Sequence, residues 1–495
     1  MTTEFNDLSQ SKKFELLNWY YENNGMYNSE AQAAFGVDTW AENMKPLRNP
    51  AYRVVEFYVA TIWPGDLPKA LPIKTDNSKI VAPIQQVWTW SNWAAKKQVA
   101  SRWFARDGNL FIKVATLTPD PSPALRHPLG QGAGEGSASR VYFQLLEAKY
   151  VTDIEADERG YLTYIRIDTP VVEGGKALTR TEVWDKEAQT YTVWVHDKSA
   201  DTPTEKLGPP RELKGLAEFG IDFIPIVYAK FRDTGQDWGE CAFQHALDKI
   251  DEANVIASRL HDMLLPGEVW VLKANGTDAS GRPLPAPKIG SSTGTGTTEK
   301  LEIARRTLFR LPGNSELESL VPNINYDAAL NVLNAHMDEL EKDLPELAYY
   351  RLREMSDLSG RAIRLLLGDA IAKAKEARGT AEAALARADA MALTIGAAVG
   401  LDGFSGLGDY AAGDFAHTFA ERDIIALSDL DKLVDVILLT DTRMPLLTIL
   451  REMGWDEERI NQLTADKEQE AEQSQALLGT TMAAAQKNFD RGQGA

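Results

Sequence analysis

Apolar residues recur at three- and four-residue steps along residues 359–400, the most regular stretch of the chain. This spacing places one set on a single side of a helix: Ile363, Leu366, Ala370, Ala374, Ala377, Ala381, Ala384, Ala388, Met391 and Ile395. Most charged residues fall away from this stripe, namely Arg361, Arg364, Asp369, Lys373, Glu376, Arg387 and Asp389. With Ser359 as N-cap and no internal proline, the pattern predicts a spine helix of roughly 60 Å. Its alanines favour close packing, and Gly368 and Gly379 predict kinks or very near neighbours.

The first half of the chain combines helical and strand patterns. Residues 1–48 look helical and polar, and a helix over 49–65 buries Val54, Phe57, Tyr58 and Ile62 before Pro64 and Gly65 end it. A single second helix is predicted over 84–106. From 109 to 230 the period changes to two, which predicts strands at 109–115, 140–146, 161–168, 181–185, 191–197 and 224–231. We therefore expect an α+β fold with an antiparallel meander, interrupted by an exposed Pro- and Gly-rich loop at 118–139.

The second half returns to helix. An amphipathic pattern over 239–265 stops at Pro266 and Gly267, and a short-stranded, Gly- and Thr-rich insert follows at 266–324. Another helix is predicted over 325–344. A charged connector, 345–358, then leads into the spine helix. After Gly400 we expect a Gly-rich joint to about 413 and helices at 427–439, 444–453 and 457–478.

Composition narrows the class of protein. The 495 residues are 44% hydrophobic and 25% charged, which is ordinary for a folded protein, and the single cysteine, Cys241, excludes an intrachain disulfide and fits a reducing compartment. No apolar signal core opens the sequence, and the apolar run at 390–401 is too short to cross a bilayer. A net charge of −19 disfavours tight, unspecific binding to nucleic acid, but it permits a wall past which DNA slides.

No catalytic, cofactor or metal site is expected from the residues. The six histidines show no i, i+3 or i, i+4 pair that would hold a metal from one helix: they are His127, His196, His245, His261, His336 and His417. The glycine-rich segments 130–136 and 294–299 complete no nucleotide-binding fingerprint. GFSG at 403–406 matches a nucleophile elbow only loosely, because Leu407 replaces the final glycine.

Three stretches resemble the portal protein of tailed bacteriophages, the ring at one capsid vertex. They are NPAYRVVEFYVATIWPG at 49–65, the segment 344–379 from connector into spine helix, and MPLLTILREMGWDEERINQLTADKEQEA at 444–471. Together with the helix at 239–265, the likeness spans most of the chain in the same order. The resemblance implies a wing at 1–238, stem helices at 239–265 and 325–344, a clip at 266–324, a tunnel loop at 345–358, a spine helix of the wing at 359–400 and a crown at 401–495.

The resemblance also implies a function and partners. Copies of the chain, commonly twelve in that family, would form a ring that passes double-stranded DNA during packaging and ejection. The implied partners are the terminase large subunit, the major capsid and scaffolding proteins and a head-completion adaptor, with a location in the virion, in host cytoplasm during assembly, and no membrane. The loop at 118–139 and two arginines in the tunnel-loop segment depart from the family pattern.

Channel and tunnel-loop candidates follow from that likeness: Asp338, Glu341, Tyr349, Tyr350, Arg351, Arg353 and Glu354. We expect the two acidic stem residues to face the channel, while the arginines contact phosphate weakly or pair with Glu346 or Glu354. Two alternatives remain open at this point: another head–tail adaptor or scaffold-binding protein, and a hydrolase that uses Ser405.

Overall fold

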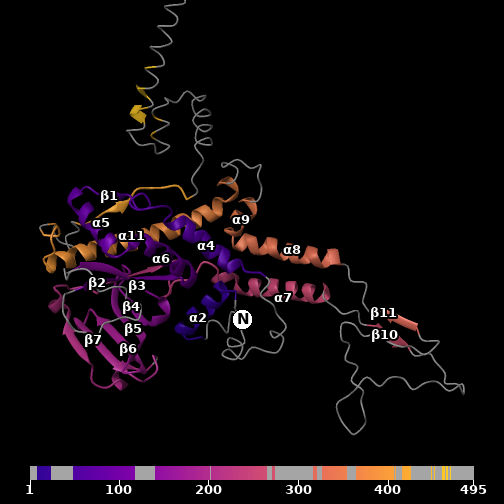
Figure 1. The fold of residues 1–495 in the computed structure, drawn as a ribbon, viewed down its shortest axis with the longest axis horizontal. Coiled ribbons are helices and arrows are strands. Elements are labelled where there is room, and N and C mark those ends of the chain that lie inside the picture. The colour runs from indigo at the N-terminus through magenta and orange to yellow at the C-terminus, as the bar shows by residue number, and fades with distance from the viewer. Residues whose placement is uncertain are drawn as a thin grey trace, which may run out of the picture. The chain divides into compact units, whose positions relative to one another are not determined.

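A computed structural model describes residues 8–23, 48–117, 140–200, 202–264, 270–273, 316–319, 326–353, 364–405, 407 and 415–424, with a few isolated positions between 448 and 469. Contacts divide the chain into two compact units. The first comprises Met1–Arg351 with Leu367–Ile424, and the second Leu352–Leu366 with Ile425–Ala495. Helices and sheets of the first unit confirm the predicted α+β class (Figure 1).

Four helices of the amino-terminal part pack on one another: α2 (Gln10–Tyr21), α4 (Pro50–Ile62), α5 (Val81–Trp90) and α6 (Trp93–Asp107). The bounds of α4 were predictable because the Asn49 side chain accepts a hydrogen bond from the Tyr52 N–H at 3.0 Å and Pro50 occupies the first turn. The predicted single helix over 84–106 is wrong. Asn92 adopts a left-handed conformation, φ 51°, and separates α5 from α6.

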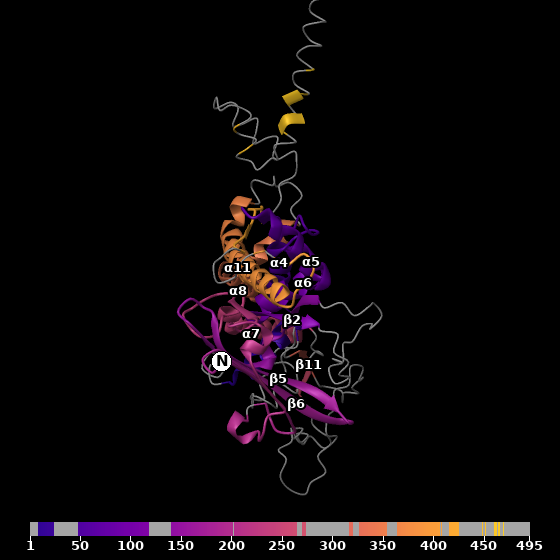
Figure 2. The ribbon, with the colours of Figure 1, turned by 90° about the vertical axis from the view of Figure 1, so that its left-hand side faces the viewer.

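The spine helix is α11 (Gly368–Ala398), which lies against α4, α5, β2, β3 and β9 of the same unit (Figures 1 and 2). The predicted alanine stripe from Ala370 to Ile395 is buried. Gly400 ends the helix in a Schellman motif: it has φ 73°, and the Leu401 N–H donates to the Gly396 carbonyl at 2.9 Å.

Two residue placements in the spine prediction are wrong. Leu366 is 60% exposed, and Asp389, expected on the polar side, is fully buried. For Gly368 and Gly379 the prediction was a kink or a near neighbour, and a Cβ built at either glycine meets no atom within 4 Å, so the near neighbour is absent. The alanine seam is covered by the chain's own elements and does not need another subunit to complete it. The predicted start at 359–363 lies outside the described residues.

The segment 109–230, for which six strands were predicted, contains eight in its described part, and they form two antiparallel sheets instead of one meander. One sheet has the order β3-β2-β9, from β2 (Asn109–Leu117), β3 (Arg140–Leu146) and β9 (Ile226–Lys230). The other is a sequential meander of β4 (Val151–Ala156), β5 (Leu162–Glu173), β6 (Lys176–Asp185), β7 (Thr190–His196) and β8 (Glu212–Gly215). Sequence reasoning missed β4 and β8. The loop predicted at 118–139 lies outside the described residues.

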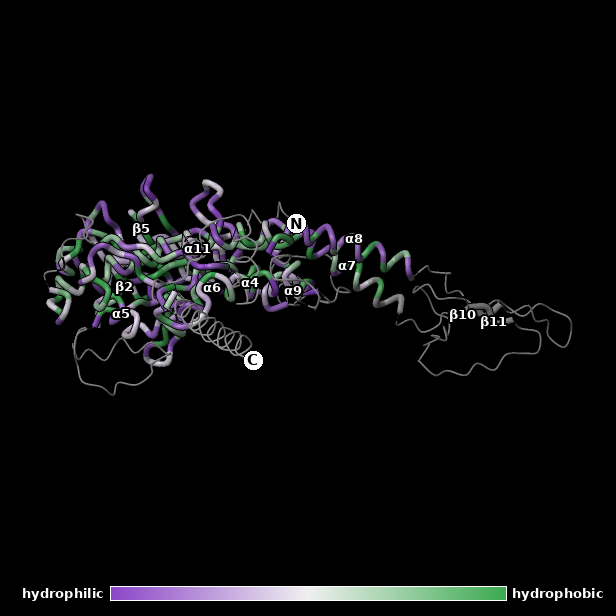
Figure 3. The backbone as a smooth tube through the Cα atoms, turned by 90° about the horizontal axis from the view of Figure 1, so that it is seen from above, coloured by the Kyte–Doolittle hydropathy of each residue, from purple (hydrophilic) through white to green (hydrophobic). Residues whose placement is uncertain are grey.

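Two antiparallel helices, α7 (Leu247–Leu264) and α8 (Tyr326–Asp343), lie side by side in the first unit (Figures 1 and 3). The start predicted at 239 is too early, since a 3₁₀ turn, Gln244–Ala246, precedes α7. In the sequence between α7 and α8, β10 (Trp270–Lys273) pairs with β11 (Glu316–Ser319), in agreement with a short-stranded insert. The segment expected as a charged connector contains a helix, α9 (Leu347–Arg353).

Residues 415–424 belong to the first unit, although the sequence placed everything after 400 in one crown. There β12 (Thr418–Phe419) pairs with β1 (Ile73–Lys74). In the second unit the isolated described positions, such as Thr448 and Ile460, are helical, as expected for 444–453 and 457–478. The helix expected at 427–439 lies outside the described part of the chain.

Candidate functional site

The α7–α8 pair carries a strong negative charge. Helix α8 has five acidic residues and one lysine, and α7 has four acidic and two basic residues, so the pair has a formal net charge of −6. The two helices are held by Leu333 and Leu340, which are buried, and by Lys249, whose Nζ lies 2.5 Å from an Asp343 oxygen and 3.9 Å from a Glu339 oxygen. Much of the acidic surface of α8 therefore faces solvent in the single chain.

Three of the predicted channel residues come together where α9 approaches α8. The Arg351 guanidinium lies 2.7 Å from Glu341 Oε1 and 3.8 Å from Asp338 Oδ1. The sequence offered Glu346 or Glu354 as partners for the arginines, and for Arg351 the structure gives these α8 carboxylates instead. Arg351 and Asp338 remain more than half exposed, at 54% and 70% of their side chains, so solvent screens the pairing and it adds little stability.

The predicted tyrosines face the body of the first unit. The Tyr350 hydroxyl donates to the Arg53 carbonyl at 2.9 Å, and the ring of Tyr349 meets that of Phe57 edge-on at 5.6 Å. Burial, with help from the charge of Glu56, raises the pKa of Tyr350 to about 12. These two residues anchor α9 to α4. Glu354 and the side chain of Arg353 lie outside the described residues.

A buried carboxylate fixes the start of α9. Glu346 is fully buried, its Oε1 accepts a hydrogen bond from the Tyr58 hydroxyl at 2.5 Å, and Lys373 Nζ of α11 lies 3.8 Å away. Burial, with the charge of Glu346, raises the pKa of Tyr58 well above its ordinary value. The sequence named Glu346 only as a partner for arginine and missed this role, because nothing local shows that Tyr58 will face it.

A second buried polar cluster joins α11 to His417, the residue just before β12. Asp389 accepts a hydrogen bond from Trp88 Nε1 at 2.9 Å, and its other oxygen lies 3.2 Å from His417 Nε2. The second ring nitrogen of His417 donates to the Phe415 carbonyl at 3.0 Å. Burial lowers the pKa of His417, but the hydrogen bond and charge of Asp389 outweigh it, so this pKa is raised. The cluster is fully enclosed and stabilises the packing of α11.

The remaining sequence-based expectations concern a hydrolase nucleophile, a metal site, a membrane helix and glycine-rich loops. Ser405 follows α11 in a turn, so the strand–turn–helix context of a nucleophile elbow is missing there. Within the described residues no group of His, Cys, Asp and Glu side chains is arranged to hold a metal ion. None of the helices in that part of the chain is long and apolar enough to span a bilayer. Both glycine-rich segments, 130–136 and 294–299, lie outside the described residues.

Comparisons with known proteins give matches among solved structures alone: no family model and no curated protein matches the sequence. A chain from the neck of a native gene transfer agent particle, computed with C12 symmetry, aligns over 87% of this chain and 94% of its own at 11% identity and a TM-score of 0.40. A chain from the neck of the empty particle, computed with C6 symmetry, covers 74% and 82% at 12% identity and 0.36.

A chain from the virion of the native gene transfer agent particle covers 69% of this chain and 77% of its own, at 14% identity and a TM-score of 0.34. All three scores are low, and likeness at this level leaves the family undefined.

Proposed function

We propose that the chain is a portal subunit of a phage-like particle. Copies of it form a ring at one capsid vertex, and the ring provides the channel through which double-stranded DNA is packaged and ejected. The observation that carries this proposal is the acidic α7–α8 pair, which returns the chain to the body of the first unit, with a two-stranded antiparallel sheet, β10–β11, inserted in the sequence between the helices.

The charge of this pair suits a DNA channel. A duplex that must slide cannot be held by many Lys and Arg contacts, because each pairing with phosphate releases counterions and adds affinity. A net charge of −6 on the two helices repels the polyanion and keeps it centred. In this proposal Asp338 and Glu341 line the wall, and Arg351, already paired with both, moderates the local field without gripping phosphate.

Exposed apolar side chains on α8 suit a ring contact. Leu330 and Val332 are 46% and 58% exposed, one turn or less from the buried Leu333 that packs within the pair. Leu330 and Val332 are two residues apart, so they lie on different sides of α8. In a closed ring each subunit meets its neighbours through two different faces, and exposed apolar side chains on both sides of α8 can be covered in that way. The insert 266–324 then supplies the docking region for a terminase motor, and the remaining first unit meets capsid, scaffolding and adaptor proteins.

Mass photometry of the purified chain tests the proposal. We expect a discrete species of about a dozen subunits, and we expect the double change Leu330→Asp with Val332→Asp to shift the population to monomers. Val172→Asp is the matched control, since Val172 is 75% exposed on β5, away from α8. A wild-type chain that stays monomeric under every assembly condition would contradict the proposed function. Equal loss of rings in both variants would contradict the role given to α8.

A further inference from the structure

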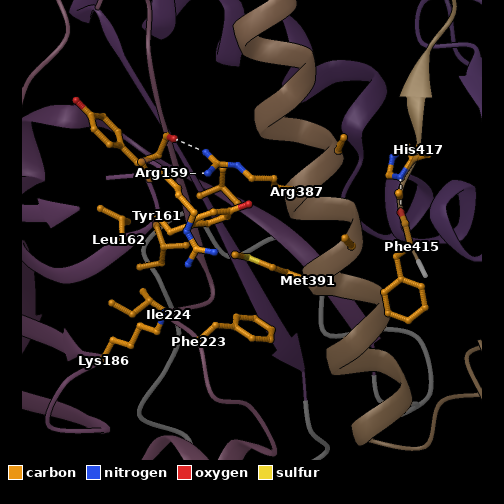
Figure 4. Close-up of a pocket in the computed structure, with 17 residues that line it drawn as sticks. Arg159, Tyr161, Leu162, Lys186, Phe223, Ile224, Arg387, Met391, Phe415 and His417 are labelled. Atoms are coloured by element: carbon orange, nitrogen blue, oxygen red, sulfur yellow. Dashed lines mark hydrogen bonds between the residues drawn. The ribbon is translucent and has the colours of Figure 1, made fainter. Parts of the chain in front are cut away.

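A cavity of about 520 Å³ opens between α11, β9 and the turn that joins β4 to β5. Its volume lies within the roughly 300–1,000 Å³ typical of pockets that bury ligands. Four buried apolar side chains form much of its wall: Leu162, Phe223, Ile224 and Met391. Figure 4 shows these side chains on the same side of α11 as Tyr161 and Arg387.

Three basic side chains line the same cavity: Arg159, Lys186 and Arg387. The two guanidinium groups stack on the ring of Tyr161, with Arg159 Cζ 5.0 Å and Arg387 Cζ 4.9 Å from the ring centroid (Figure 4). Stacking occupies the face of a guanidinium and leaves its N–H edge for hydrogen bonds. Arg159 already donates to Asp157 through Nε and Nη2, and Arg387 to backbone carbonyls through Nη1 and Nη2, so the remaining N–H groups are the ones open to a carboxylate or phosphate. The arginines are therefore held in place by the ring.

The partners of these cations leave positive charge at the cavity. Arg387 donates to two backbone carbonyls, those of Tyr228 at 2.8 Å and Gly160 at 3.5 Å, which carry no charge. Arg159 is 74% exposed and pairs with Asp157 at 3.1 Å, which offsets its charge, so the surplus rests on Lys186 and Arg387. None of the residues that line the cavity is acidic. In a chain of net charge −19, this is a local surplus of positive charge beside an apolar pocket.

The geometry favours a side chain as the inserted group over an added strand. β9 is an edge strand of its three-stranded sheet, yet Arg387 already occupies the Tyr228 carbonyl on that strand. A strand added here would have to displace the guanidinium. A single large apolar side chain can instead enter beside Phe223 and Met391 without breaking a backbone hydrogen bond. Aromatic anchors in such pockets, with arginines nearby, supply most of the affinity in many protein interfaces.

We propose that this cavity binds an acidic segment of a partner polypeptide, which inserts one aromatic side chain between Phe223, Ile224 and Met391. Carboxylates on either side of the aromatic residue meet Lys186 and those N–H groups of Arg159 and Arg387 that do not already bind Asp157, Tyr228 or Gly160. Charge complementarity selects an acidic partner and rejects a basic one. This site is separate from the α7–α8 pair and does not depend on ring formation.

Fluorescence anisotropy with a labelled peptide, acetyl-Glu-Asp-Phe-Asp-Glu-amide, tests the site on the full chain. We expect saturable binding that weakens with salt, because partly exposed charges are screened. The analogue with Gln and Asn in place of the acids should bind at least tenfold more weakly, and so should the analogue with Ala in place of Phe. The absence of saturable binding by the acidic peptide would overturn the proposal.

Surface variants locate the site without risk to the core. Lys186→Glu and Arg159→Glu should each weaken binding of the peptide at least fivefold. Lys176→Glu introduces the same charge change at an exposed position of β6 and should leave binding unchanged. Equal effects of Lys176→Glu and Lys186→Glu would mean general electrostatic attraction and would refute the site. Binding of 3-phenylpropionate as tightly as the peptide would show a small-molecule site and would also refute it.

Discussion

Two glycines of α11 give a matched test of how the spine helix is seated. A Cβ built on Gly396 would lie 2.5 Å from Phe404 Cδ1 and 3.0 Å from two further ring atoms, whereas a Cβ on Gly379 meets nothing within 4 Å. The Phe404 ring cannot easily retreat, since it is 1% exposed and stacks on Trp90 at a centroid distance of 5.8 Å. Alanine should therefore be tolerated at Gly379 and resisted at Gly396.

The magnitudes follow from helix propensity and packing. Exchange of an interior helical Gly for Ala stabilises by about 1 kcal/mol, and this gain is common to both sites. Overpacking of a buried site typically costs about 1–3 kcal/mol. We expect Gly379→Ala to raise the free energy of unfolding by about 0.5–1 kcal/mol. The free energy of unfolding of Gly396→Ala should be about 1–3 kcal/mol lower than that of Gly379→Ala, because only the packing cost at Phe404 distinguishes the two variants.

Urea denaturation followed by tryptophan fluorescence measures the difference, with Trp90 beside the perturbed ring. A double-mutant cycle with Phe404→Leu should show that the cost of Gly396→Ala shrinks when the ring is removed, because the two sites are in contact. If Gly396→Ala stabilises the chain as much as Gly379→Ala does, the close approach of Phe404 to α11 is wrong.

Three further predictions concern stability, pH and the channel wall. Gly108→Ala should destabilise severely, because Gly108 has φ 73° and a Cβ there would lie 2.5 Å from the Glu240 backbone carbon; loss of soluble folded protein by circular dichroism checks this. Since the folded pKa of His417 is raised, its stabilising contribution should be complete below about pH 6.5 and fade as pH rises through the folded pKa, so the difference in urea stability between wild type and His417→Gln should shrink from pH 6 to pH 9. A constant difference would contradict the charged Asp389 pair. Arg351→Ala should keep rings intact and alter DNA retention in filled particles, whereas Arg351→Lys should be milder; unchanged retention in both would remove the role given to Arg351.

Helix bounds and buried faces could be predicted from the sequence where neighbouring residues determine them. Asn49 and Pro50 at one end and Pro64 and Gly65 at the other fixed α4 almost to the residue. The alanine stripe of α11 gave its buried face correctly from periodicity alone. The break at Asn92 was missed because an asparagine in a left-handed conformation leaves no sequence mark as strong as glycine or proline.

Side-chain contacts between residues that are distant in sequence could not be predicted. Asp389 was predicted to face solvent because a charged side chain is expected at the surface when only its neighbours in sequence are considered. In the structure Trp88 and His417, which are distant in sequence, bind its two oxygens inside the core. For the same reason the partners of Arg351 on α8 were not foreseen, although Asp338, Glu341 and Arg351 were all selected as candidates. The residues that line the basic cavity come from segments at or near β5, β9 and α11, which are distant in sequence, so no local motif predicts the cavity.

Averaged electron micrographs of the assembled chain, viewed down the symmetry axis, test the central claim most directly. We predict a closed ring with an open centre wide enough for a DNA duplex, and with the acidic α7–α8 helices around that opening. Compact single molecules, or closed assemblies without a central hole under conditions that favour assembly, would contradict it.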